Sequence, residues 1–341
     1  MAGARRVVQF LALMAAVGAL CAGVWARLPR ERSLLERAIN VSGSNGAENF
    51  YWFNNREILS VYNSGYDHYH VNRYDVAAKT KTNLPAVEKA MHFLMQGAIY
   101  PSGDGRQFLC PGWDDGGDGN AHIVSLDTAT VTAATSSAEP LVWNPGAASW
   151  LYFSEQGAAL VNPLNPRLRR VLPIKPPDFD DPQPDFMMIT PDNRLLEAGG
   201  VMDSDSGAVK ITLAEWRVET NRVVPVRQYE FSAAPEKPTG REEPTYCAIN
   251  PQGSRVFWSQ CSAPSESFFH RQMRRLFPGR FAPPKNRLEI WSANLDGTDR
   301  RNFGFIEMGD ENFLPMRIRF SPDGTQIGFV YGGAIYALTA Q

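Results

Sequence analysis

The sequence has only four cysteines among 341 residues, which is too few for a disulfide framework. Cys247 and Cys261 flank an expected hairpin turn. If Asn250 pairs with Arg255 across that turn, Cys247 faces Trp258 and Cys261 lies about three residues out of register. The two sulfurs would then be roughly 10 Å apart, which is too far for a disulfide bond. We therefore interpret these cysteines as small buried hydrophobic residues.

Neither sign of charge is in excess, because 34 Lys and Arg residues stand against 36 Asp and Glu, for a net charge of −2. The chain as a whole thus has no excess of basic residues, and we expect no nucleic-acid partner. The hydrophobic fraction of 43% is enough for a large buried core.

Common catalytic motifs are missing as well. The sequence contains no Gly-x-Ser-x-Gly elbow, no P-loop and no His-Glu-x-x-His. Its five histidines, at positions 68, 70, 92, 122 and 270, do not point to a catalytic triad. These absences favour a binding protein over an enzyme and leave the enzyme alternative open.

A hydrophobic run of twenty residues, 7–26, stands near the N-terminus, with basic residues at both ends. Its length predicts a hydrophobic helix. We interpret it as a signal peptide with a cleavage site ending at Ala26, or as an uncleaved membrane anchor. A lipoprotein signal at Cys21 is disfavoured, because Leu20 stands where a small residue is required.

One pattern recurs along the rest of the chain: an apolar strand, a turn rich in Pro, Asp, Asn and Gly, and a second apolar strand. Proline presets φ at the first turn position, and Gly or Asn accepts a positive φ further on, so each copy predicts a β-hairpin. Two more short strands follow each copy, which gives four antiparallel strands per unit. The turn residues that mark the six copies are Asn55, Gly105, Gly146, Asn193, Gly253 and Gly324.

These turns follow one another at intervals of 50, 41, 47, 60 and 71 residues. Periods of about 40–50 residues with four strands each are typical of propeller blades. The last two intervals are long because of insertions, chiefly residues 263–287. The sequence therefore predicts an all-β fold, a six-bladed β-propeller preceded by the hydrophobic helix. A seven-bladed propeller is the alternative.

The clearest copy lies at residues 318–338, where Ser-Pro-Asp-Gly at 321–324 is followed by Ile-Gly-Phe-Val at 327–330. This copy resembles the PD40, or WD40-like, repeat of TolB-like propellers, and residues 288–298 resemble the strand and turn that precede it there. The resemblance implies a protein of the bacterial cell envelope, either membrane-anchored or periplasmic. It implies no single activity, because propellers host many functions.

We divide the chain into a signal peptide or anchor at 1–26, a stem with a closing strand at 27–47, and a propeller at 48–341 with an insertion at 263–287. Only three strands of the last blade are expected before the sequence ends, so its outermost strand must come from elsewhere to avoid an open edge. The expected donor is residues 37–42.

The resemblance to propellers also predicts where a ligand binds. Loops between the second and third strands of each blade lie together around the channel mouth, and ligand sites in this fold favour that face. The most polar of these loops supply the candidate ligand-binding residues, which are Tyr66, Asp67, His68, His70, Trp113, Asp114, Asp115, Glu155, Asp203 and Asp205.

Two of these loops offer metal ligands. Asp67, His68 and His70 are ligand types that suit Zn, Mn or Fe, although the two histidines share a face only in an extended segment. Asp114, Asp115 and Asp118 could hold Ca²⁺, and a Ca²⁺-binding loop that starts at Asp114 matches in part, at Asp118 and Gly119. The alternative is that both loops are merely solvated, and we expect no cofactor beyond Ca²⁺ or a transition metal.

The insertion at 263–287 contains six Lys or Arg residues against one Glu, interspersed with Phe. Such a stretch can contact an anionic membrane or a protein partner. The candidate contact residues are Arg271, Arg274, Arg275 and Arg280. The alternative is a surface loop that tucks its Phe side chains against a blade.

The favoured function is an envelope-located, TolB-like propeller that binds a protein, peptide or glycan partner at the channel mouth and meets the membrane through residues 7–26. One alternative is a metal-assisted carbohydrate lyase or hydrolase that uses Asp67, His68 and His70. The other is a structural subunit of a membrane complex, with the basic insertion as its contact.

Overall fold

The chain divides into two compact units, Met1–Arg32 and Ser33–Gln341. A computed structural model describes residues of the second unit only, namely 33–42, 49–63, 69–91, 99–113, 119–136, 141–144, 148–154, 157–162, 169–172, 186–202, 209–219, 223–233, 246–262, 268–276, 285–308 and 317–340. The hydrophobic run at 7–26, with its expected helix, therefore lies outside the described residues. None of the helices within the described part has the length and hydrophobicity of a transmembrane segment.

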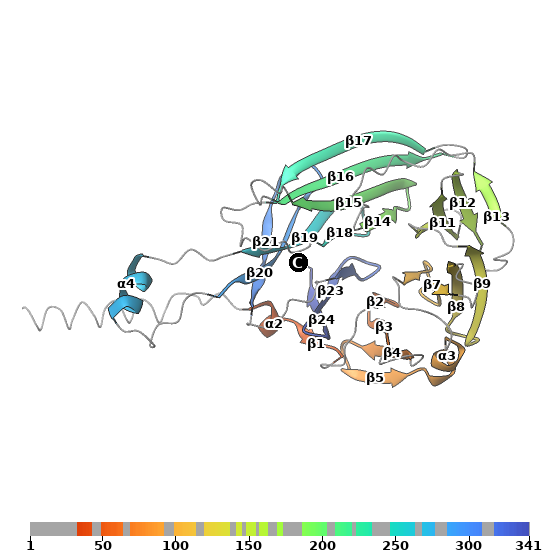
Figure 1. The fold of residues 1–341 in the computed structure, drawn as a ribbon, viewed down its shortest axis with the longest axis horizontal. Coiled ribbons are helices and arrows are strands. Elements are labelled where there is room, and N and C mark those ends of the chain that lie inside the picture. Colours follow the sequence, from red (N-terminus) through yellow and green to blue (C-terminus); the bar gives the residue numbers. More distant parts are fainter. Residues whose placement is uncertain are drawn as a thin grey trace, which may run out of the picture. The chain divides into compact units, whose positions relative to one another are not determined.

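The second unit is built from six four-stranded antiparallel sheets, the blades of a propeller (Figure 1). Blades one to three comprise β2 (Asn49–Trp52), β3 (Glu57–Asn63), β4 (Tyr69–Asp75) and β5 (Thr80–Asn83); β6 (Tyr100–Pro101), β7 (Gln107–Trp113), β8 (Gly119–Ser125) and β9 (Thr130–Ser136); and β10 (Leu141–Asn144), β11 (Ser149–Ser154), β12 (Gly157–Val161) and β13 (Arg169–Leu172). Blades four to six comprise β14 (Phe186–Ile189), β15 (Arg194–Met202), β16 (Val209–Val218) and β17 (Val223–Ser232); β18 (Cys247–Ile249), β19 (Arg255–Ser262), β20 (Arg287–Asn294) and β21 (Arg301–Glu307); and β22 (Ile318–Phe320), β23 (Gln326–Tyr331), β24 (Ala334–Thr339) and β1 (Ile39–Asn40). The described sheets confirm the prediction of six blades over the seven-bladed alternative.

The first strand of each blade lies innermost. Strand β22 contacts β2 and β18, β14 contacts β10 and β18, and β6 contacts β10. The blades accordingly follow one another around a common centre in Figure 1. We use the name loop end for the end of the ring at which these first strands begin. The name turn end is used for the opposite end, where the first hairpin of each blade turns.

Apolar side chains fill the space between neighbouring blades. The described residues form six buried clusters, and each cluster joins one pair of adjacent blades. Trp150 from blade three packs against Leu109 of blade two, and Trp258 of blade five packs with Leu196 of blade four; both indoles are fully buried. Burial of this kind stabilises the chain by about 25 cal/mol for each Å² of apolar surface. The core is therefore a ring of interfaces.

The hairpin turns owe their shape to side chains that hydrogen-bond their own backbone. In blade six, Ser321 Oγ accepts from Gln326 N (3.0 Å) and donates to Asp323 Oδ1 (2.6 Å). Asp323 Oδ1 also accepts from Thr325 N at 3.0 Å, and Gly324 takes a positive φ of 73° that few other residues tolerate. The same arrangement recurs with Thr190 and Asp192 in blade four and with Ser102 and Asp104 in blade two.

Hydrogen bonds at the turn end also join neighbouring blades. Tyr51 Oη donates to the Gly105 carbonyl (3.0 Å), which joins blades one and two. Gln252 Nε2 donates to the Asp323 carbonyl (2.9 Å) between blades five and six. Asp323 N in turn donates to Asn55 Oδ1 (3.0 Å) between blades six and one. The polar groups of the turn end are thus largely used by the fold itself.

Strand β1 completes blade six and closes the ring. Ile39 pairs with Ala337, and Asn40 with Tyr336. The ladder continues past the strand, because Val41 N donates to the Ile335 carbonyl (2.8 Å) and Ile335 N donates to Ser42 Oγ (2.8 Å). The expected donor segment at 37–42 therefore supplies the outermost strand of the last blade.

The described residues form three helices besides the blades. Helix α2 (Leu34–Arg37) buries Leu34 in the cluster between blades five and six, and its Arg37 donates to the Phe303 carbonyl of β21. Helix α3 (Pro85–Ala90) packs on β4, where Glu88 Oε1 accepts from Val71 N at 2.9 Å. Helix α4 (Phe268–Leu276) lies within the insertion for which no strand pattern was expected.

Of the two cysteines that flank the hairpin at 250–255, Cys247 has the strand partner that the sequence predicted. Cys247 pairs with Trp258, as predicted, whereas Cys261 pairs with Leu288 of the next strand. None of the three described cysteines forms a disulfide bond. Cys110 and Cys247 are buried, but Cys261 is only half-buried, which corrects its interpretation as a buried residue.

Loss of the Ser42 hydroxyl tests the closure of the ring. The Ser42→Ala variant leaves the buried Ile335 N–H without its acceptor, so we expect the free energy of unfolding to fall by about 2 kcal/mol. Urea denaturation measures the change. Thr82→Ala on the exposed face of β5 is the control and is expected to shift stability by less than about 0.5 kcal/mol. Equal losses in the two variants would contradict a role for Ser42 in closure.

A buried carboxyl group lies at the interface of blades three and four. Glu197 on β15 is 8% exposed, and its Oε1 has no hydrogen-bond partner among the described residues. Burial raises its pKa to about 7, and the neighbouring Trp216 indole opposes this rise only in part. The folded chain therefore binds this proton more tightly than the unfolded chain. Stability is lost as the pH rises from about 4.5 to about 7.

Replacement of this carboxyl by an amide is expected to remove the pH dependence. At pH 8 the Glu197→Gln variant should exceed the wild type in stability by up to about 3 kcal/mol, because no charge then forms at the buried position. At pH 4 the two proteins should differ little. Melting curves across this range measure the effect, and Glu307→Gln on the exposed side of β21 is the control. A constant difference at all pH values would rule out titration of Glu197.

Candidate functional site at the loop end of the ring

Most of the predicted ligand-binding residues lie outside the described residues. These are Tyr66, Asp67, His68, Asp114, Asp115, Glu155, Asp203 and Asp205, together with Arg280 of the insertion. Trp113 ends strand β7, and His70 is the second residue of β4. Both strand ends lie at the loop end, so these two positions are on the predicted face.

His70 contacts groups of its own blade and of α3. Its ring stacks on Tyr62, with centroids 4.8 Å apart, and its Nδ1 lies 3.9 Å from Glu88 Oε1. No group of three or more His, Cys, Asp or Glu side chains suited to a metal ion occurs within the described ranges, which omit Asp67 and His68. Metal binding by these residues stays a prediction.

The basic residues of the insertion lie on α4. Arg271, Arg274 and Arg275 occupy positions i, i+3 and i+4, which share one side of a helix. Arg271 and Arg275 are exposed, and Leu276 at the end of the helix is 68% exposed. A role in contacting a partner or membrane remains a prediction.

Two arginines at the start of β22 form a feature that sequence analysis did not identify. Ile318 and Phe320 of this strand face blade five, where the Phe320 ring lies 4.6 Å from that of Phe257. Side chains alternate along a strand, so Arg317 and Arg319 face the other side, toward blade one. We call these two residues the axial arginine pair.

The surroundings of the axial arginine pair come from the first strands of other blades. Arg317 donates to Asn49 Oδ1 at the start of β2, and the Arg319 carbonyl accepts from Trp52 Nε1 (3.1 Å). The phenol of Tyr100, at the start of β6 in blade two, lies near enough to act on the charge of Arg319. Residues from blades one, two and six therefore meet among the innermost strands, with Arg317 and Asn49 at the loop end.

The guanidinium of Arg319 forms no hydrogen bond or ion pair with any residue that the structure describes, and the residue is half-buried. Burial and the neighbouring Arg317 charge both lower the pKa of Arg319, and Tyr100 partly offsets them. A charge held out of bulk solvent without a partner destabilises the folded state. Such a group marks a candidate functional site.

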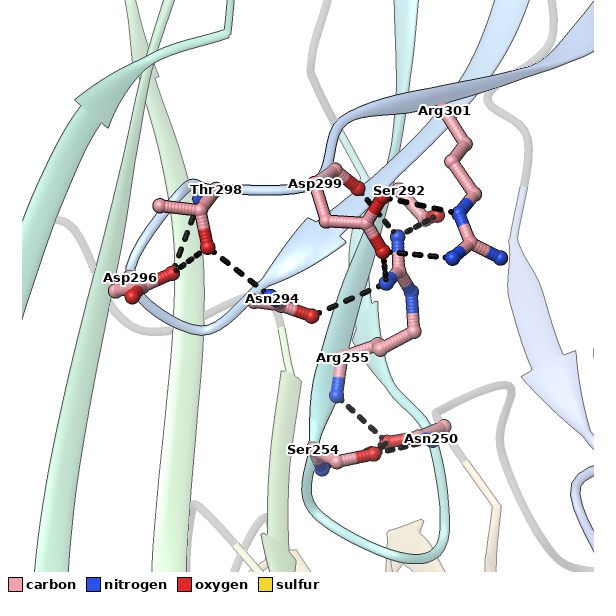
Figure 2. Close-up of polar contacts among 9 residues, drawn as sticks. All are labelled: Asn250, Ser254, Arg255, Ser292, Asn294, Asp296, Thr298, Asp299 and Arg301. Carbon is pink, nitrogen blue, oxygen red and sulfur yellow. Dashed lines mark hydrogen bonds and ion pairs between the residues drawn. The ribbon is translucent and has the colours of Figure 1, made fainter.

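Arg255 in blade five shows how this fold treats an arginine that serves structure (Figure 2). Its guanidinium donates to Asp299 Oδ2 (2.7 Å), the Asp299 carbonyl (2.7 Å), Ser292 Oγ (3.0 Å) and Asn294 Oδ1 (3.1 Å). Arg301 and then Arg255 hold the pKa of Asp299 below its usual value. This arginine is satisfied within its own blade, whereas Arg319 is not.

Comparisons with known proteins add little beyond the fold. No family model and no curated protein sequence matches the chain, so membership of the PD40 family stays a prediction. The chain is similar to TolB from Acinetobacter baumannii at 11% identity and a TM-score of 0.47, covering 84% of this chain and 64%, less than two thirds, of that one. A chain of the Mitotic Checkpoint Complex shows 11% identity, a TM-score of 0.49 and coverage of 92% and 94%.

A putative TolB from Agrobacterium tumefaciens shows 14% identity, a TM-score of 0.42 and coverage of 86% of this chain and 90% of that one. Similarities at this level carry no conclusion about ligand or activity. The propeller architecture rests instead on the six described sheets and their pairing.

Replacing Arg255 and Arg319 in turn should distinguish an arginine that stabilises the fold from one that does not. Arg255→Met removes four hydrogen bonds to Ser292, Asn294 and Asp299, of which only the Asp299 carboxylate keeps a second donor, Arg301, and it should lower the free energy of unfolding by about 2 kcal/mol. Arg319→Met removes an unpaired charge, so we expect stability equal to or above that of the wild type. Urea denaturation of both variants measures this. A loss with Arg319→Met as large as that with Arg255→Met would show that Arg319 serves the fold.

Proposed function

We propose that this chain is a cell-envelope propeller that binds a protein or peptide partner at the loop end of its ring. The observation that carries the proposal is the axial arginine pair, because Arg319 is a charged group that the described fold does not use. The hydrophobic run at 7–26 supports delivery of the propeller to the envelope.

The residue types at this end suit a protein partner. Arginine and tyrosine are enriched among the residues that contribute most to protein interfaces, where one planar group offers both apolar contact and hydrogen bonds. Arg317, Arg319 and Tyr100 bring these types together from blades six and two. The polar loops predicted to bind a ligand, including those with His70 and Trp113, join strands at the same end of the blades.

No specific observation favours the alternatives. A metal-assisted lyase or hydrolase depends on Asp67 and His68, which lie outside the described residues. A glycan of neutral sugars gives no reason for an unpaired arginine, because such sugars carry no charge to match it.

Site-specific photocrosslinking tests the proposal in cells. A benzophenone side chain at position 70, in place of the partly exposed His70, lies at the loop end. The matched control replaces Asp127 in a turn of blade two at the turn end, whose side chain is 59% exposed. We expect a crosslinked protein adduct from position 70 of the full-length chain and none from position 127, as read by gel shift and mass spectrometry. Adducts only from position 127, or equally from both, would contradict binding at the loop end.

A further inference from the structure

The charge pattern at the loop end differs from that around three other arginines of the described structure. Arg56, Arg194 and Arg255 each lie within 2.6–2.8 Å of a carboxylate oxygen. Arg317 and Arg319 have no carboxylate partner among the described residues, and the charge of Arg317 lowers the pKa of Arg319. Two positive charges therefore follow one another on the same side of the chain at β22, and no carboxylate of the described residues pairs with either.

The chemistry of these groups selects the kind of ligand that relieves this imbalance. A guanidinium is a planar fork of N–H donors that matches the two oxygens of a carboxylate. The Tyr100 phenol is a further polar group beside Arg319. An arriving anion would restore a favourable environment for both charges without any rearrangement of the strands. The absence of a competing acidic side chain from the described surroundings leaves the fork available for a ligand.

We infer that Arg319, assisted by Arg317, binds a carboxylate of an acidic peptide segment at the loop end of the ring. This inference rests on the proposed function, because it names the chemical class that the partner presents there. A carboxylate suits a peptide partner, since Asp, Glu and the chain terminus all supply one. Inorganic phosphate shares the oxyanion chemistry, so the experiment must separate the two sources.

Selection from a phage library of short random peptides tests the inference. The full-length chain, held in lipid nanodiscs, is the target in parallel with Arg319→Gln, Arg319→Lys and Arg56→Gln. Arg56 lies at the turn end with a 65% exposed side chain, so its variant removes the same charge away from the site. Melting curves check that each variant folds. Peptides selected by the wild type are then synthesised, with Gln and Asn counterparts, and their affinities measured with and without inorganic phosphate.

We expect the wild type and Arg56→Gln to select peptides enriched in Asp and Glu. The affinity of these peptides should fall about tenfold or more for Arg319→Gln and for the amide counterparts. Arg319→Lys keeps the charge but loses the planar fork, so its affinity should lie between the two. Phosphate should weaken binding only at concentrations far above those of the peptide.

Four results would overturn the inference, and they differ from one another. Selected peptides without acidic enrichment, or acidic peptides that bind Arg319→Gln as tightly as the wild type, would remove the assignment while leaving peptide binding intact. Phosphate that binds at the site while no acidic peptide does would show an anion site of another kind. Failure of every protein to select any peptide, together with absence of crosslinks at position 70, would remove the proposed function itself.

Discussion

The pairing of β1 with β24 is the constraint on which the rest of the structure depends. Without it, blade six would have three strands and would expose the unpaired edge of β24. The segment that provides β1 also contributes Leu34 to the cluster between blades five and six, and Val41 to the neighbourhood of blade one. A single short stretch thus ties together three blades. Because the ring is closed in this way, the starts of β2, β6 and β22 face one another at the loop end.

The two ends of the ring use their polar groups differently. At the turn end, Ser321 and Asp323 shape one hairpin, and Asp323 also bonds the turns of both neighbouring blades. Arg255 follows the same principle, since all four of its acceptors belong to blade five (Figure 2). Arg319, by contrast, has no acceptor for its guanidinium among the described residues. The satisfied groups hold the ring together, and we propose that the unsatisfied guanidinium of Arg319 contacts a partner.

Much of the fold could be predicted from the sequence, because its determinants are local. The Pro, Asp and Gly residues of each turn act on their own backbone, as the bonds within residues 321–326 show. The closing strand was predictable from the rule against open edges, and the pairing of Cys247 with Trp258 from the turn between them. The half-buried state of Cys261 was not predictable in this way, because it depends on Met308 and the strand that follows β20.

The candidate site was harder to predict, because it arises from closure and not from a motif. The alternation Arg-Ile-Arg-Phe at 317–320 was a usable signal, since a short inner strand that carries two charges needs an explanation. What the sequence does not contain is the arrangement that sets Tyr100 of blade two near Arg319 of blade six, more than two hundred residues apart. The sequence pointed instead to the polar loops between the second and third strands of the blades. Most of the residues of these loops lie outside the described part of the chain.

Arginine labelling with phenylglyoxal tests the central claim most directly. The reagent modifies guanidinium groups, and mass spectrometry reports the rate for Arg319 and Arg255 in the same full-length, folded protein. The account predicts that Arg319 reacts faster than Arg255 in the free protein and that an acidic peptide bound at the loop end protects Arg319 alone. Reaction of Arg319 at the slow rate of Arg255, unchanged by the peptide, would contradict it.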